Sequence, residues 1–592
     1  MPGISVLQGD FRDHSIESET LFDAVCYFDE YDTDMYVDQP ATVAGATGYD
    51  DYPVERFETD DAIVLLEGFV YDSFDPATLV GALDGNERDT LTDWVAHADG
   101  DFLVVVVWKA DDRVAVLNDT FARLPAYYTT IGGTTVVTRE LGFVRAVARQ
   151  FGNPVGLDQL AAAQQLVFEY PLGTRTLFDG VKSIPPGSLV RIDDGVRVDR
   201  LHQYDFGRTV ETDRDSTDIA AELADRLVTS CAKRQVSGAR TILSLSGGLD
   251  SRVVLAGYAA TDADFETVTF DKENGLYEDD IRIARSLADA LGVEWSAYEV
   301  GATDRDRSQL LDLKQGMNNV SMAYMVDFFD QLRTDHGFVT YATGDGGHRA
   351  LVDETPPREP TSQTDLVDQL LESNARFVPA QAAALTGIEE DAIYESIHAR
   401  FDSYPEDDLP AKYDHFMFRE RGLNFIQHGE DRNRYFCWSV SPFYAPDVFR
   451  YAIACPTEYK HNRNLFAALL EELAPEFLQY DYANVGAPLG SLEFRVKEYV
   501  IEQIMRHKRV KDVVARLLKD DSEATRTIAR RLRTHLQTTE DLSPLAADEV
   551  ASVASDPGSY RPYGLNTLYT LTMLAADLQA VELPTEPHPA SQ

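Results

Sequence analysis

The stretch SGGLDS, residues 246–251, contains the residue types that could bind a phosphate. Gly247 and Gly248 let backbone N–H groups turn toward a ligand, because neither residue carries a Cβ. The N-terminus of a following helix would add more N–H groups and the positive end of its dipole. Ser246 and Ser251 add hydroxyl donors. We therefore interpret this stretch as a loop suited to a pyrophosphate group.

Asp250 does not suit a phosphate directly, so this interpretation requires a bridging Mg²⁺, as is usual for nucleotide phosphates. The chain contains neither GxxxxGK[ST] nor GxGxxG, so neither a Walker A loop nor a dinucleotide fingerprint is indicated. The alternative is a capped structural turn, with Asp250 as the acid at a helix start. The six residues alone leave this alternative open.

Alternating strands and helices are expected to position the loop. A short strand precedes the glycines and a helix starts near Ser251, while residues 216–236 form a helix capped by Ser216 or Thr217. Further strands are expected at 265–271 and from 338, and a helix at 279–292. This alternation predicts a parallel, doubly wound sheet with ligands beyond the carboxyl ends of its strands, after Ser246 and Ala342.

The first 200 residues differ in composition, because they are rich in β-branched and aromatic residues. Strands are expected at 62–72, 101–119 and 134–141, and the 104–108 run is apolar on both faces, as in a strand buried between layers. A Pro-Pro-Gly turn is expected between two strands within 177–195. From about residue 360 the pattern is helical, with an exposed loop at 355–365 and a frayed tail. We predict three parts, 1–205, 206–520 and a helical extension at 521–592.

The composition restricts the class of protein. The chain has 592 residues, with 100 Asp and Glu against 53 Lys and Arg, a formal net charge of −47. Such a charge repels nucleic acid and anionic membrane surfaces, so neither is an expected partner. An aromatic content of 10% argues for a folded chain rather than disorder, and the acidic surface predicts a halophilic source. A homo-oligomer is compatible with the sequence.

Several absences favour a cytoplasmic protein. The four cysteines form no CxxC pair and no disulfide framework. The N-terminus lacks the basic start and apolar core of a signal peptide. No apolar run approaches the roughly 18–20 residues that a membrane span needs.

Several ordered motifs in residues 60–490 resemble those of the asparagine synthetase family. SGGLDS is similar to the pyrophosphate loop of that family. The further matching segments are DTFARLPAYY (119–128), TRELGFV (138–144), LFDGVKSIPPGSLVRI (177–192), DDIRIARSLADALGV (279–293) and ATGDGGHRAL (342–351).

The resemblance implies an α/β fold: an N-terminal Ntn-hydrolase-like β-sandwich, then a PP-loop ATP pyrophosphatase domain with a parallel sheet and a helical C-terminal part. It implies an ATP- and Mg²⁺-dependent ligase that activates a small carboxylate as an acyl-adenylate, releases pyrophosphate and joins an amine. By the resemblance, the nucleotide contacts include Leu245, Phe270, Thr343 and Gly344, besides the residues of the loop. Arg463 aligns with the family's phosphate-binding lysine, and Lys460 is the competing candidate.

The sequence departs from the family at its N-terminus. The family's glutaminase needs a cysteine directly after the initiator Met, whereas this chain has Pro2. Cys26 lies in an apolar stretch and is interpreted as a core residue. The segment that holds glutamine in the family is EGFVYD here, with Glu67 and Phe69 at its key positions. Asp89 could be a remnant of that site but is interpreted as a surface acid. We predict no glutaminase activity.

The second departure concerns the metal. Asp345 stands where the family has a glutamate, and His348 stands at the family's metal-binding aspartate. An imidazole is a poorer Mg²⁺ ligand than a carboxylate, so Asp345 is expected to supply the second oxygen beside Asp250. A solvent-facing role for His348 is the alternative.

Two further functions are weighed against the ligase. A nucleotide-binding protein without catalysis is favoured by His348 and disfavoured by the intact SGGLDS loop. Adenylation or thiolation of tRNA is disfavoured by the net charge and the absence of paired cysteines. Chains that resemble β-lactam synthetase and lasso-peptide cyclase lack the same N-terminal cysteine, so an amine within the substrate is among the candidates.

Overall fold

The computed structural model describes residues 2–14, 18–193, 195–207, 215–236, 238–272, 278–506 and 522–580. Two antiparallel six-stranded sheets occupy its N-terminal part. The first sheet has the order β10 (Lys182–Ser183), β8 (Tyr127–Ile131), β9 (Thr134–Thr138), β1 (Gly3–Gly9), β3 (Thr42–Gly48) and β2 (Asp32–Asp38). The second has the order β12 (Val196–Arg200), β11 (Ser188–Ile192), β7 (Val114–Asn118), β6 (Gly100–Trp108), β5 (Ala62–Val70) and β4 (Val54–Glu58).

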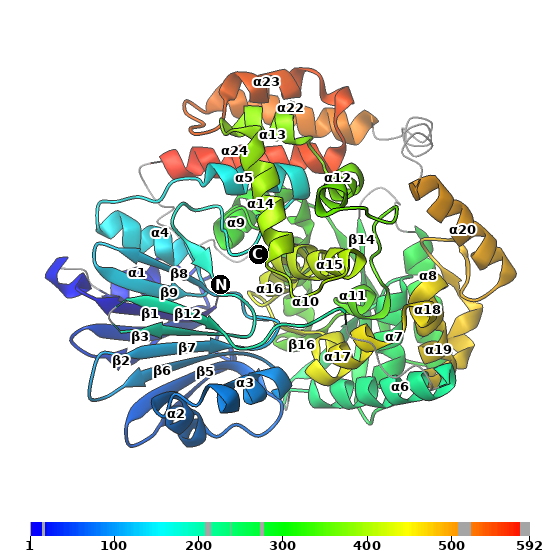
Figure 1. Ribbon diagram of the computed structural model, residues 1–592, viewed down its shortest axis with the longest axis horizontal. Coiled ribbons are helices and arrows are strands. Elements are labelled where there is room, and N and C mark those ends of the chain that lie inside the picture. Colours follow the sequence, from blue (N-terminus) through cyan, green and yellow to red (C-terminus); the bar gives the residue numbers. More distant parts are fainter. Residues whose placement is uncertain are drawn as a thin grey trace.

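Strand β6 shows why these sheets stack. Its side chains alternate: Leu103 and Val105 join the core between the two sheets, whereas Val104 packs against helices on the outer face. Helices α2 (Pro76–Asp84) and α3 (Arg88–His97) cover that outer face, and α1 (Ser18–Asp23) and α4 (Leu141–Gln150) cover the first sheet. The prediction of a strand buried between layers is confirmed, and the layers are visible in Figure 1.

The Pro-Pro-Gly turn joins two strands, as expected, but they do not pair with each other. Strand β10 pairs with β8 in the first sheet, and β11 pairs with β7 in the second. The turn therefore carries the chain from one sheet to the other.

A parallel five-stranded sheet follows, with the order β15 (Trp295–Val300), β14 (Phe265–Lys272), β13 (Arg240–Ser244), β16 (Val339–Ala342) and β17 (Trp438–Val440). The parallel sheet was predicted, but β15 and β17 were not. Strand β17 has only three residues, and β15 has alternate residues exposed, so neither gives the continuous apolar run of a buried strand.

The helices around this sheet agree closely with the sequence expectations. Helix α6 (Ser216–Lys233) is capped by Asp215, whose side chain accepts from the N–H of Thr217, so the expectation of Ser216 or Thr217 as cap is wrong. Helix α7 (Leu249–Ala259) starts two residues before the predicted Ser251. Helix α8 (Glu278–Leu291) is followed by Gly292 at φ 68°, a left-handed conformation that favours glycine.

The remainder of the described chain is mostly helical. Its helices are α5 (Gln159–Phe168), α9 (Asp304–Lys314), α10 (Tyr324–His336), α11 (Gly347–Leu351), α12 (Gln363–Asn374), α13 (Pro379–Thr386), α14 (Glu390–Asp402), α15 (Leu409–Phe416), the π-helix η3 (Met417–Ile426), α16 (Gln427–Asn433), α17 (Pro446–Ala454), α18 (Thr457–Lys460), α19 (Asn464–Leu473), α20 (Leu492–Arg506), α22 (Ser522–Thr538), α23 (Ala547–Ser555) and α24 (Pro562–Gln579).

Helices α22, α23 and α24 form a layer at the top of Figure 1, where α24 packs beside α5. The loop expected at 355–365 is found as far as residue 362, mostly exposed or half-buried, whereas residues 363–365 already belong to α12. The tail predicted to fray lies outside the described residues. None of the helices in the described ranges combines the length and the apolar character that a membrane crossing requires.

Candidate functional site

A large cavity opens at the carboxyl ends of the parallel strands, where the strand order reverses between β13 and β16. Its volume is about 860 Å³. Seven of the residues predicted from sequence line it, namely Ser246, Asp250, Ser251, Phe270, Thr343, Gly344 and Asp345. Four predicted residues, Leu245, Gly247, Gly248 and Arg463, are not among those that line it.

The SGGLDS loop is tied together by its own side chains. The hydroxyls of Ser246 and Ser251 are 3.0 Å apart, and the N–H of Gly248 donates to Ser246 Oγ at 3.2 Å. The N–H of Gly247 is already bonded to Asp280 Oδ1 at 2.9 Å. Gly248 is the N-cap residue of α7 and has no side chain to cap it. The N-terminus of α7 is thereby left for an anion.

Arg252 fixes the start of this helix. Its side chain is fully buried and donates to the carbonyl oxygens of Asp481 at 2.6 Å and Tyr480 at 3.0 Å. Burial lowers the pKa of Arg252 to about 10. The guanidinium thereby joins α7 to residues 477–481 and fixes the SGGLDS loop. Ser246, Asp250 and Ser251 of that loop line the cavity.

Asp250 lies between the two glycine-rich loops. A Cβ added to Gly347 would be 2.6 Å from Asp250 Oδ1, and one added to Gly344 would be 2.6 Å from the backbone nitrogen of Ser251. Glycine is therefore needed for the close approach of these loops. Asp250 Oδ1 is buried and has no hydrogen-bond partner. Burial raises the pKa of Asp250, against the opposing charges of His348, Arg463 and Arg349.

Asp345 is the second carboxylate of the site. Burial and the neighbouring Glu430 raise its pKa to about 7. The unpaired Asp250 oxygen and the half-buried carboxylate of Asp345 fit Mg²⁺, which takes one or two protein carboxylates and completes its shell with phosphate oxygens and water. In the part of the chain that the structure describes, no group of three or more His, Cys, Asp or Glu residues could hold a metal by itself.

His348 lines the cavity, and its side chain contacts the carboxylate of Glu354. Its Nε2 is 3.1 Å from Glu354 Oε1, and Arg349 contacts the same carboxylate. Burial alone would raise the pKa of Glu354, but Arg349 and His348 hold it well below its usual value. The imidazole of His348 thus contacts Glu354 instead of pointing freely into solvent. It has no oxygen atom with which to replace a carboxylate ligand of a metal.

The two candidate phosphate-binding cations are both engaged elsewhere. Arg463 Nε donates to Glu498 at 2.9 Å, and Lys460 Nζ is bonded to Asp353 at 2.7 Å. Lys460 is buried, and neither residue lines the cavity. The role of Arg463 stays a prediction.

Sequence reasoning missed the opposite wall of the cavity. This wall comes from the π-helix η3 and from α16, and it contributes Arg421 and Arg432. A π-helix is rare and often marks a functional site. The remaining polar lining residues include Asn318, Asn319, Ser321, Tyr324 and Asn433. A usable signal was the group of arginines at 419, 421, 432 and 434 in an otherwise acidic chain.

The region around β1, where the resemblance implies a glutamine pocket, is filled with charged side chains. Glu67 is fully buried and accepts from the N–H of Ile4 at 2.8 Å, the Tyr52 hydroxyl at 2.6 Å and Arg139 Nε at 2.8 Å. A Cβ on Gly3 would be only 2.5 Å from Glu67 Oε1. The carboxylate therefore packs directly against the start of the chain.

The other residues singled out in this part lie apart from that network. Asp89 is exposed on α3, as expected of a surface acid. Cys26 is half-buried and contacts Phe22 and Thr33, and burial raises the pKa of its thiol. These surroundings agree with a core role for Cys26.

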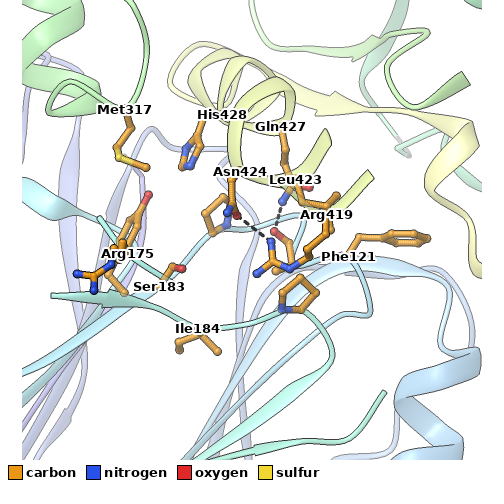
Figure 2. Close-up of a pocket in the computed structure, with 14 residues that line it drawn as sticks. Phe121, Arg175, Ser183, Ile184, Met317, Arg419, Leu423, Asn424, Gln427 and His428 are labelled. Atoms are coloured by element: carbon orange, nitrogen blue, oxygen red, sulfur yellow. Dashed lines mark hydrogen bonds between the residues drawn. The ribbon is translucent and has the colours of Figure 1, made fainter. Parts of the chain in front are cut away.

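A small cavity of about 30 Å³ lies where the two parts of the molecule meet. Figure 2 shows Ser183 and Ile184 on one side and Gln427 and His428 of α16 on the other. Burial, helped by Lys314, lowers the pKa of His428 to about 3. The imidazole is therefore neutral at ordinary pH, and its Nδ1 is buried without a hydrogen-bond partner.

Comparison with known proteins gives one family match. The asparagine synthase family model matches residues 222–342, the segment that contains SGGLDS, β13, β14 and β16. No curated protein matches the chain.

Several solved structures match the chain at low similarity. The glutamine phosphoribosylpyrophosphate amidotransferase of B. subtilis, in complex with ADP and GMP, is 9% identical, covering 69% of this chain and 94% of its own, at a TM-score of 0.22. The NMN synthetase of Francisella tularensis is 16% identical, covering 38% and 97%, at a TM-score of 0.18. TM-scores near 0.2 do not establish a shared fold. The family match over 222–342 is thus the finding that supports a relation to the asparagine synthases, and it falls on the segment that carries the SGGLDS loop.

Proposed function

We propose that this protein is an ATP-dependent carbon–nitrogen ligase that activates a small carboxylic acid as an acyl-adenylate. One observation carries the proposal: the SGGLDS loop and the unpaired carboxylate of Asp250 face a cavity of about 860 Å³ at the switch point of the parallel sheet. The asparagine synthase match over 222–342 supports it. The part with the parallel sheet would then be a PP-loop pyrophosphatase unit. The N-terminal part, with its two antiparallel sheets, would be an Ntn-type sandwich.

The chemistry follows from the residues that face the cavity. A carboxylate oxygen of the acid attacks the α-phosphorus of ATP, the bond to the β-phosphate oxygen breaks, and pyrophosphate leaves. The amine nitrogen then attacks the acyl carbon, loses a proton, and AMP departs with the former carboxylate oxygen. Ser246, Ser251 and the N-terminus of α7 would hold the pyrophosphate, so that its charge is stabilised as it develops. Mg²⁺, when bound at Asp250, would neutralise phosphate charge.

We propose further that the amine does not come from glutamine hydrolysed by this chain. Position 2 is Pro2, and Glu67 with Arg139 occupies the region at the start of β1. Neither a thiolate nor a glutamine-sized space is offered by these contacts. Free ammonia, a separate amine or an amine within the acid would complete the reaction.

The direct test is pyrophosphate release from ATP, Mg²⁺ and a panel of carboxylic acids in molar KCl, a medium chosen for the acidic composition. We expect release that depends on the acid and that is lost in Ser246→Ala/Ser251→Ala. The exposed Asp89→Asn variant is the matched control and should retain the wild-type rate.

The alternative is a nucleotide-binding protein without catalysis. ATP binding without pyrophosphate release for any acid would favour that alternative. Release of ammonia from glutamine by the purified protein would contradict the proposed loss of glutaminase activity, and incubation without ATP keeps that measurement separate from ligation.

A further inference from the structure

Arg432 is a buried cation whose charge the protein balances only in part, through the nearby carboxylate of Asp345. Only 3% of the residue is exposed, and its Nε and Nη1 atoms are buried without a hydrogen-bond partner. Its one hydrogen bond is from Nη2 to the neutral Asn433 Oδ1, at 2.8 Å. No ion pair to Arg432 is found among the described residues. A guanidinium in this state is costly, because burial removes water that would otherwise solvate it.

Arg434, two residues further on, is the natural comparison. It is also fully buried, but it donates to the carbonyl oxygens of Arg123 at 2.6 Å and Ser439 at 2.9 Å and lies 3.2 Å from Glu430. Arg434 therefore stabilises the fold through contacts that Arg432 lacks. Arg432 instead lines the 860 Å³ cavity.

Within the cavity, Arg432 lies close to Asp345. The charged neighbours that act on Asp345 include Glu430, Arg123 and Arg432, whereas those that act on Asp250 are His348, Arg463 and Arg349. Arg432 thus lies near Asp345, Tyr324 and Tyr341, which line the same cavity.

We infer that Arg432 binds the carboxylate of the acid substrate and holds it on the Asp345 side of the cavity. This inference rests on the proposed function, since it assigns the place of the acid in that reaction. A substrate carboxylate supplies the direct ion pair that the guanidinium lacks, and its two oxygens match the paired N–H groups of an arginine. Asn433 and Tyr324, which also line the cavity, offer further polar contacts to the same ligand.

The test compares Arg432→Met with Arg434→Met and uses acetate, succinate and L-aspartate as probes, at constant ionic strength against chloride. In the wild-type protein at least one probe should raise Tm beyond chloride, and titration calorimetry should give a Kd. We expect Arg432→Met to weaken that binding at least 10-fold, and Arg432→Lys to lie between it and the wild type. ATP affinity in Arg432→Met should stay within about 2-fold of the wild-type value.

Stability separates a binding role from a structural one. Without probe, Arg432→Met should unfold at the wild-type Tm or above it, because a buried charge that is balanced only in part is removed, whereas Arg434→Met should unfold at a lower Tm. Equal loss of Tm in both variants would show a structural role and overturn the inference. A 10-fold loss of ATP affinity in Arg432→Met would place it on the phosphates, and no binding of any probe by the wild type would also overturn it.

Failure of the proposed function has a different signature. Probe binding and its dependence on Arg432 are measured without catalysis, so they can hold in a protein that releases no pyrophosphate. A ligase that releases pyrophosphate with an unchanged acid KM in Arg432→Lys and Arg432→Met would instead leave the function standing and refute the role of Arg432.

Discussion

Two regions of this protein bury charged side chains. In one region these side chains are paired with each other, and in the other some of their polar atoms have no partner. Near Gly3, both oxygens of Glu67 accept hydrogen bonds, and Arg139 bridges Glu67 to Asp431. At the cavity, Asp250 and Arg432 keep buried polar atoms without partners. Buried charges that are paired on the chain itself belong to the architecture. Buried charges that are left unpaired beside a cavity indicate a ligand, because nothing else offsets their desolvation.

Buried charges join the N-terminal part to the helix at the cavity wall. The charges at the start of β1 link it to α16, since Arg139 Nη2 is 2.9 Å from Asp431 and Lys314 contacts the same carboxylate. Helix α16 also carries Arg432 into the cavity wall. The N-terminal sheets are therefore bonded to the helix that carries Arg432.

The largest effect should come from breaking the paired region. Arg139→Met leaves Glu67 and Asp431 buried without their shared cation, and losing one partner of such a pair costs about 3–5 kcal/mol of unfolding free energy. Urea unfolding measures it. Arg56→Met, in an exposed pair with Glu58, is the control and should cost less than ~1 kcal/mol. A similar small cost for Arg139→Met would refute the architectural role.

In the unpaired region, the expected loss is of activity rather than stability. Asp250→Asn removes the carboxylate proposed to hold Mg²⁺, and we expect pyrophosphate release to fall on the order of 10²–10³-fold. The unfolding free energy should be unchanged or higher, because burial disfavours the charged form of Asp250. A marked destabilisation would mean that the carboxylate is structural after all.

The boundary between the two regions can be probed with pH. The pKa of His428 is lowered to about 3 by burial and by Lys314, and Arg139 and Asp431 also lie near it. Between pH 3 and about 6.5 the unfolded chain then binds more protons than the folded one, so stability falls as the pH falls through this window, by up to ~1.4 kcal/mol per unit. His428→Asn should flatten the pH dependence of urea unfolding below pH 6.5. The exposed His97→Asn is the control and should leave the slope as it is.

The smallest effect is expected for Arg463→Met. The guanidinium of Arg463 is bonded to Glu498 and does not line the cavity, so pyrophosphate release should fall less than about 10-fold. Steady-state kinetics with ATP varied will measure the change. A loss as large as that of Asp250→Asn would show that residues 460–464 move into the site when substrates bind.

The loops that line one part of the cavity could be predicted from the sequence, because they depend on local signals. A strand end, two glycines and a helix start follow one another around SGGLDS, and residues 343–347 repeat this arrangement between β16 and α11. The opposite wall has no such signal. Arg421 and Arg432 come from a π-helix and the helix that follows it, some 170 residues after the loop that they face.

The sequence by itself determined the residue types of the SGGLDS loop and the alternation that makes a parallel sheet. Those are properties of short stretches, where spacing and side-chain chemistry suffice. Only the tertiary structure decided which charged groups are paired: Glu67 and Asp431 with Arg139, and Arg463 with Glu498. Pairing depends on residues tens to hundreds of positions apart meeting at about 3 Å, and that meeting is fixed by packing rather than by any local pattern.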